Sequence, residues 1–415
     1  MASQSKIRIA KESGVGVTWP RGFRAAGGTC GIKPSGSPDL ALIAADAPCT
    51  AAGVFTTNRL PGAPVTVSKA HVAKGRARAI VCNSGCSNVA TGAAGVDDAH
   101  RMCRAAADCV GCDPAEVLVC STGVIGHRLP MAKILPGIAQ VATQLTAGAA
   151  ADAHAARCIM TTDLVPKLAA RSVKVAGKTV RLGGIAKGSG MIAPNLATML
   201  VFITTDAAVA AAPLRAALQA AARATFNRMS VDMDTSTSDT VLALASGLAG
   251  NAKISAAKGA GYDAFAAALR DLCADLTYQL VKDGEGATKV FRVLVCGARD
   301  EKEADRVGKT LVDSPLLKSA VHGGDPNWGR LIAAVGRSGV PVTFDTLALK
   351  IAGVAVFKDG EPAVRSAPQQ NKLDEAMQAK EVTFTIDLGR GPAHVEWLGC
   401  DLSEEYVKIN ADYTT

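Results

Sequence analysis

Short apolar runs alternate along the chain with longer stretches in which apolar residues recur at helical spacing. The short runs are rich in Val, Ile, Leu and Ala and predict strands, whereas the longer stretches predict amphipathic helices. Strands are predicted at 77–82 (ARAIVC), 116–120 (EVLVC) and 173–186 (VKVAGKTVRLGGIA), and helices near 96–109, 130–147, 213–225 and 263–281. Pro213 is expected at the opening of the third helix, where its missing N–H costs nothing. The alternation predicts an α/β fold.

The pattern of predicted strands and helices changes after the glycine-containing stretch DGEGATK at 283–289. A strand (FRVLVCG, 291–297) and a charged helix (from 299) follow, and then several strands between 341 and 410. A length of 415 residues exceeds what one hydrophobic core usually serves. We therefore expect one domain at 1–285 and a smaller α/β domain at 286–415.

Composition adds a prediction about compartment. Aromatic residues make up 4% of a chain that is 48% hydrophobic, so its core must consist mainly of small aliphatic side chains. Twelve cysteines spread over a long chain, behind an N-terminal stretch without an apolar run, are typical of reduced thiols in a cytoplasmic protein. Residues 188–205 carry no charge up to Thr205, but Pro194, Asn195 and several glycines argue against a membrane span.

The net charge of +8 is unevenly distributed. Residues 1–197 carry 22 Lys and Arg against 10 Asp and Glu, and residues 198–415 carry 23 against 27. Opposite signs would help two pieces of a cut chain to stay together, although unequal solvated surfaces explain the asymmetry equally well. The basic stretch 69–80 has no interleaved aromatic residues, so no nucleic-acid partner is expected.

Thr198 stands where the polar, Gly-rich segment KGSGMIAPNLA (187–197) meets the apolar run MLVFI. Its hydroxyl could attack the carbonyl of Ala197, shift the acyl group from nitrogen to oxygen and, after hydrolysis, leave a new N-terminal threonine. The freed α-amine titrates near pH 8 and would supply the base that a threonine nucleophile needs. On spacing alone, however, an ordinary β-branched strand residue is the favoured interpretation.

The whole segment resembles the signature of the ornithine acetyltransferase family, the glutamate N-acetyltransferases of arginine biosynthesis. Further blocks in family order extend the resemblance over nearly the full chain. They are CNSGCSNVATG (82–92), STGVIG (121–126), TTD (161–163), KGSGMIAPNLATM (187–199), DMDTSTSDT (232–240), DGEGATK (283–289), HGGDPNWGR (322–330) and the final NADYTT.

The resemblance implies a role for each matching residue. Thr198 matches the nucleophile and first residue of the β chain, and Ala197 the last residue of the α chain. Thr122 and Gly123 match the pair that stabilises the oxyanion, a task suited to a hydroxyl or N–H donor beside a closely approaching backbone. The positions that match substrate contacts are Thr161, Lys187, Glu285, Asn410 and Thr415.

The resemblance also implies the reaction and the assembly. Thr198 would take the acetyl group of N2-acetyl-L-ornithine as an ester, release ornithine and pass the acetyl group to L-glutamate, with no cofactor. Some family members also accept acetyl-CoA. The implied fold is a layered αββα sandwich with a smaller C-terminal α/β domain, assembled from two α and two β chains, with the C-terminal tail returning to the site.

Other motifs in the chain give weaker indications, and two rival functions remain open. Cys109 and Cys112 have CxxC spacing but no second pair, and DGEGATK lacks the spacing of a phosphate loop. His322 and Asp325 fit a rigid turn before a helix better than a catalytic dyad. The rival functions are a self-cleaving aminopeptidase or amidase that uses water as acceptor, and a non-catalytic small-molecule binding protein.

Overall fold

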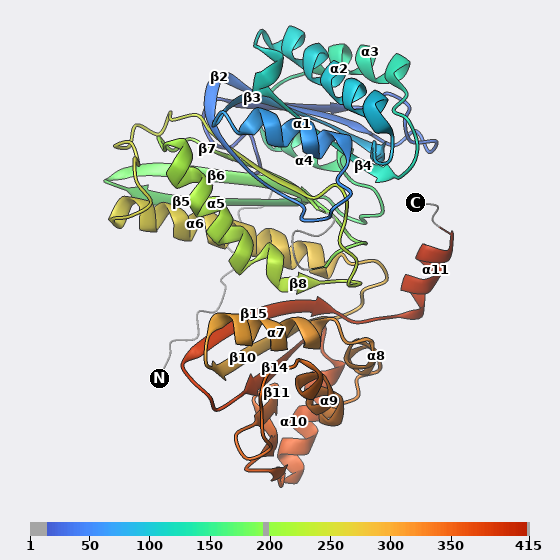
Figure 1. Cartoon of the computed structure of the whole chain (residues 1–415), viewed down its shortest axis with the longest axis vertical. Coiled ribbons are helices and arrows are strands. Elements are labelled where there is room, and N and C mark those ends of the chain that lie inside the picture. Colours follow the sequence, from blue (N-terminus) through green and yellow to red (C-terminus); the bar gives the residue numbers. More distant parts are fainter. Residues whose placement is uncertain (1–14, 194–198, 413–415) are drawn as a thin grey trace.

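The larger of two sheets is organised by one long strand. The computed structural model describes residues 15–193 and 199–412. In it, strand β2 (Leu40–Phe55) pairs with β1 (Phe23–Gly28) up to Ala45, with β3 (Arg76–Cys86) up to Thr50, and from Thr50 onward with β9 (Thr240–Ala245). The strand order is β4-β3-β2-β9-β7-β6-β5, with β4 (Val117–Val124), β5 (Lys167–Val175), β6 (Lys178–Lys187) and β7 (Leu200–Thr205). The two halves, joined through β2, lie as successive layers in Figure 1.

Alternating side chains show that each half of this sheet packs on both faces. In β7, Leu200 and Phe202 belong to the core between the two halves, whereas Val201 and Ile203 pack in the core beneath the helices. This period of two, with both faces apolar, is that of a strand buried between layers. Outside one half lie α1 (Ala63–Val72), α2 (Gly92–Val110) and α3 (Met131–Ala142), and outside the other α5 (Ala211–Ala224) and α6 (Ala260–Lys282).

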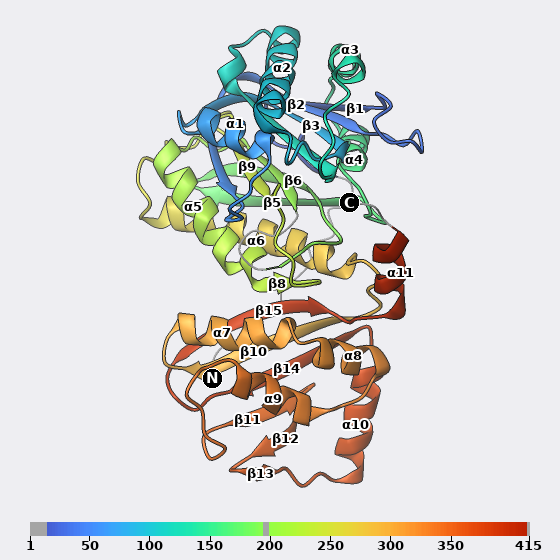
Figure 2. The same cartoon turned by 45° about the vertical axis from the view of Figure 1, so that its right-hand side comes forward.

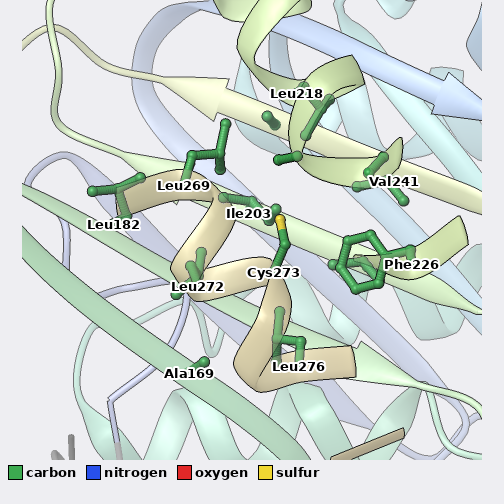
Figure 3. Packing of buried hydrophobic residues seen from close by; sticks show 14 of the residues in the cluster. Ala169, Leu182, Ile203, Leu218, Phe226, Val241, Leu269, Leu272, Cys273 and Leu276 are labelled. Atoms are coloured by element: carbon green, nitrogen blue, oxygen red, sulfur yellow. The ribbon is translucent and has the colours of Figure 1, made fainter. Parts of the chain in front are cut away.

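The predicted αββα sandwich is thus confirmed. Figure 3 shows the outer core on one side, where Leu269, Leu272, Cys273 and Leu276 of α6 pack toward Ile203 of β7. Helix α4 (Ala149–Cys158) lies at the side of the sandwich and contributes to the core between the two sheet halves. As the composition predicted, aliphatic side chains make up most of these cores.

The second sheet has its own core and lies at the other end of the molecule (Figures 1 and 2). Its order is β13-β12-β11-β14-β10-β15-β8. The strands are β8 (Met229–Ser230), β10 (Val290–Ala298), β11 (Ala348–Ile351), β12 (Val354–Lys358), β13 (Glu361–Pro362), β14 (Glu381–Asp387) and β15 (Ala393–Cys400), and the helices α7 (Glu301–Val312), α8 (Pro315–Gly323), α9 (Trp328–Arg337), α10 (Ala367–Gln378) and α11 (Glu404–Asp412). Because β8 comes from before residue 286 yet pairs with β15, the domain boundary near 286 stays a proposal.

Several predicted elements differ from the observed ones. The stretch 173–186 lies in a hairpin of β5 and β6, because Ala176 and Gly177 both adopt positive φ and form a two-residue turn. Helix α3 ends at Ala142, five residues earlier than predicted. The region between 341 and 410 holds two helices, α10 and most of α11, as well as strands. Pro213 is the third residue of α5, where an N–H would still lack a helical partner.

Candidate active site

Six of the residues singled out from the sequence line one pocket. Thr122 and Gly123 lie in the last three residues of β4, Lys187 ends β6 and Asn410 belongs to α11. Glu285 follows α6 and Thr161 follows α4. The empty space around these residues amounts to about 550 Å³, counting the part open to solvent. The other described lining residues are mostly small and polar: Ser87, Ile125, Thr162, Gly190, Met191, Ser236, Thr237 and Ser238.

Three predicted residues lie outside the described part of the chain: Ala197, Thr198 and Thr415. The strand predicted to follow Thr198 is present, since β7 begins at Leu200 and is buried throughout. Met199 is also described; its N–H donates to Asp239 Oδ1 over 3.0 Å, and its carbonyl accepts from the N–H of Thr240 over 3.1 Å. Burial raises the pKa of Asp239 well above its usual range.

Gly123 occupies a position that only glycine fits. Strands β3 and β4 run parallel with Gly85 beside Gly123, and a bulge in β3 follows at Cys86. Gly123 has a φ of 126°, and a Cβ there would lie 2.4 Å from the carbonyl carbon of Gly85. The two strand ends can therefore approach closely, with the side chain of Thr122, 3% exposed, at the pocket.

The ammonium group of Lys187 is the buried cation of the pocket. Lys187 Nζ donates to Thr161 Oγ1 over 2.8 Å and to Thr122 Oγ1 over 3.4 Å, and its residue is 2% exposed. Burial lowers its pKa, which the carboxylate of Asp163, 4.0 Å from Nζ, partly counteracts. Lys187 thus links the predicted oxyanion residue Thr122 to the predicted substrate residue Thr161.

Behind Lys187 lies a buried ion-pair network that sequence reasoning missed. Lys167 Nζ donates to Asp163 Oδ1 and to Asp283 Oδ2, each over 2.6 Å, and Lys167 and Asp163 have fully buried side chains. Although burial alone would raise it, the ammonium groups of Lys187 and Lys167 hold the pKa of Asp163 at about 2. In the sequence, the family blocks contain two members of this network: Asp163 is the third residue of TTD, and Asp283 is the first residue of DGEGATK.

Glu285 is held at the pocket by three neighbours. Its N–H donates to the carbonyl of Ser189 over 2.8 Å, and its Oε2 accepts from Asn410 Nδ2 over 2.9 Å. A Cβ on Gly190 would lie 2.3 Å from the carboxyl carbon of Glu285, so a glycine makes room for that carboxylate. An acid and a buried ammonium group therefore line the same polar pocket, which suits a ligand carrying both an amino and a carboxyl group.

The family now follows from comparison with known proteins. A model of the ArgJ family matches residues 24–415. The chain belongs to the ArgJ family. Among curated members, the arginine biosynthesis bifunctional protein ArgJ of Symbiobacterium thermophilum is 46% identical over 402 residues, covering 96% of this chain and 98% of that protein. Its counterpart from Thermosynechococcus vestitus is 44% identical over 418 residues, with the same coverage. The predicted class, an acetyltransferase of arginine biosynthesis, is confirmed at this level.

Solved structures of ArgJ proteins match part of the chain. An ArgJ chain from Bacillus halodurans is 40% identical, with a TM-score of 0.49 and coverage of 51% of this chain and 98% of that one. The ornithine acetyltransferase of Mycobacterium tuberculosis, complexed with ornithine, is 43% identical, with a TM-score of 0.40 and coverage of 44% and 96%.

Other predicted features can be placed on the structure. Within 15–193 and 199–412, no group of three or more His, Cys, Asp or Glu residues is arranged to hold a metal ion. In the same ranges no helix has the length and apolarity needed to cross a bilayer. His322, near the end of α8, has its Nδ1 2.8 Å from Asp401 Oδ2, and neither residue lines the pocket, which fits the structural duty predicted for its segment.

Proposed function

We propose that this ArgJ-family chain transfers the acetyl group of N2-acetyl-L-ornithine to L-glutamate by a ping-pong mechanism through an acetyl ester on Thr198. The observation that carries the proposal is the meeting of six family-matched residues, from separate parts of the chain, around one pocket. Membership of a family whose curated members are arginine biosynthesis bifunctional proteins supports the same reaction.

In the proposed first half-reaction, the hydroxyl of Thr198 attacks the acetyl carbonyl while the α-amine of the same residue takes the hydroxyl proton. Thr122 and Gly123 donate to the oxyanion that forms, and Lys187, hydrogen-bonded to Thr122, adds positive charge nearby. The C–N bond then breaks, and the proton held by the amine passes to the departing α-nitrogen of ornithine.

In the second half-reaction, the amine of glutamate attacks the ester carbonyl and the α-amine of Thr198 takes its proton. The C–O bond to Thr198 then breaks, and that proton returns to the threonine hydroxyl. We assign substrate contacts to Thr161, Lys187, Glu285, Asn410 and Thr415. A carboxylate of either substrate would lie near Lys187, and Glu285 would bind the side-chain ammonium group of ornithine. The α-amine becomes available by self-cleavage between Ala197 and Thr198, and the fragments remain together, in our proposal as two α and two β chains in the cytoplasm.

The decisive experiment varies the acetyl acceptor. With N-acetylornithine alone, the enzyme should release about one equivalent of ornithine and carry one acetyl group on the peptide that begins at Thr198. Added glutamate should give sustained turnover with parallel double-reciprocal plots. Steady acetate release that is indifferent to glutamate would assign the chain to the amidase class instead. Acetyl-CoA, offered as donor in the same assay, tests the second activity that some family members have.

A further inference from the structure

Asp163 binds the backbone of two residues next to Lys187: Thr161, which contacts its ammonium group, and Gly188, which follows it in the chain. Its Oδ2 accepts from the backbone N–H of Thr161 over 3.0 Å, and its Oδ1 accepts from the N–H of Gly188 over 2.6 Å. Thr161 accepts a hydrogen bond from Lys187, and Gly188 is the next residue after it. One carboxylate therefore fixes the loop that carries Thr161 to the end of β6.

We propose that Asp163 is a positioning residue for the acetyl transfer, which holds Lys187 charged and aimed at Thr122 and Thr161, and that Lys167 completes its charge balance. The inference rests on the proposed function, because it assigns to Lys187 a task in that reaction. Asp163 itself, with a fully buried side chain, does not line the pocket among the described residues and so acts through Lys187.

The buried charges around Lys187 also support this role for Asp163. Asp163, Asp283, Lys167 and Lys187 form a buried group of two carboxylates and two ammonium groups. An unpaired charge in such a place is strongly unfavourable, so each ammonium group depends on a carboxylate. The carboxylate of Asp283 accepts from Lys167 and from the N–H of Leu164, and within the described residues no ion pair joins it to Lys187. Asp163 is the carboxylate that touches both lysines.

The matched pair of variants is Asp163→Asn and Asp283→Asn, because each removes one buried carboxylate that bonds Lys167. Asp163→Asn should lower kcat/KM for acetyl exchange about tenfold to a hundredfold, since a small displacement of a reacting group has effects of that order. Asp283→Asn should lower it much less at equal loss of thermal stability. In Asp163→Asn/Lys167→Met the buried charge is balanced again, and part of the lost activity should return.

The pH profile gives a readout that a merely structural role would not move. Burial already lowers the pKa of Lys187, and removing the charge of Asp163 should lower it further, so activity should fall at a lower pH on the alkaline side. Removing Lys167 as well should move this alkaline fall in activity back toward higher pH. The other charged or titratable groups that act on Lys187 are kept in all variants: Cys82, Glu285, Lys33 and Asp239.

A direct titration separates this inference from the proposed function. Lysine labelled at the ε-carbon, with Lys187 assigned through Lys187→Arg, should show a lower pKa in Asp163→Asn than in the unmodified protein. That measurement needs no acetyl transfer. If the unmodified protein shows no acetyl exchange, the proposed function is overturned, but the result of the Lys187 titration still stands. An unchanged Lys187 titration, or equal losses in Asp163→Asn and Asp283→Asn, would overturn the positioning role.

Discussion

The side-chain amide of Asn410 donates a hydrogen bond to Glu285 Oε2 over 2.9 Å, although 125 positions separate the two residues. Helix α11, which carries Asn410, is tied to the same loop by a hydrogen bond of 2.6 Å from Ser403 Oγ to the carbonyl of Gly286. Gly286 has a φ of 68°, and a Cβ there would lie 2.5 Å from the backbone nitrogen of Tyr406. The C-terminal helix and the acid of the pocket thus form one packed unit, as Figure 2 shows for α11 beside the end of α6.

Self-cleavage is the first prediction. Purified protein should run as two fragments, and N-terminal sequencing of the C-terminal fragment should begin at Thr198, because only the freed amine completes the nucleophile. Thr198→Ala should stay as one chain, whereas Thr198→Ser, which keeps a hydroxyl, should still be cut. A fragment boundary elsewhere, or processing of Thr198→Ala, would identify another nucleophile.

Neighbouring hydroxyls on β4 provide a matched test of oxyanion stabilisation. Loss of one preorganised donor lowers turnover about 100-fold to 1,000-fold, so Thr122→Ala should reduce kcat by that order with little change in KM. Ser121 donates to Asn83 Oδ1 over 2.6 Å and does not line the pocket. Ser121→Ala should therefore lower thermal stability and leave kcat nearly unchanged. If both variants reduce kcat equally, Thr122 has no special role.

Gly190 tests the placement of Glu285. In Gly190→Ala the new methyl group would overlap the carboxyl group and push it away, so kcat/KM for N-acetylornithine should fall about tenfold or more. Gly336 in α9 is the control, because a Cβ there meets nothing within 4 Å. Gly336→Ala should keep full activity and add up to about 1 kcal/mol of helix stability. Steady-state kinetics and thermal melts of the two variants decide the matter.

The regular elements were predictable where periodicity is strong. The apolar run at 77–82 and the helical spacing in 263–281 predicted β3 and α6, because apolar residues must be buried. Helix α10 was not predicted, although the sequence contains a signal for its beginning: Ser366 and Gln369 form a capping box, and Pro368 lies in the first turn.

The site was predictable only in part. Family blocks named six residues that meet in the pocket, but no local pattern reveals that Lys167, a residue type usually solvated, is fully buried. Its partner Asp283 lies 116 positions away, so the pair exists only in the folded chain. Likewise, nothing near Gly190 in the sequence indicates that its missing side chain accommodates Glu285.

Asp232 should make stability depend on pH. Its carboxylate accepts from the backbone N–H of Ile192 and of Met191, and burial raises its pKa from 3.8 to about 6. Because the folded-state pKa lies above the unfolded value, its contribution is fully present below about pH 4 and is lost as the pH rises through 6. From pH 4 to pH 7 the apparent melting temperature of the unmodified protein should therefore fall relative to that of Asp232→Asn, which has no carboxyl group to titrate. A constant difference would contradict this assignment.

Asn410 should decide how well the acetyl ester is kept from water. If α11 shields the proposed acetyl-Thr198, loss of the hydrogen bond from Asn410 to Glu285 loosens that cover and exposes the ester. Asn410→Ala should then release acetate from N-acetylornithine several times faster than the unmodified enzyme when glutamate is absent, and transfer to glutamate should fall. Lys408→Ala on the same helix is the control, because Lys408 is exposed and pairs only weakly, over 3.4 Å, with Glu405. Acetate and N-acetylglutamate measured together give the partition ratio. An unchanged ratio in Asn410→Ala would mean that the helix end is not the barrier to water, even if the exchange reaction itself is as proposed.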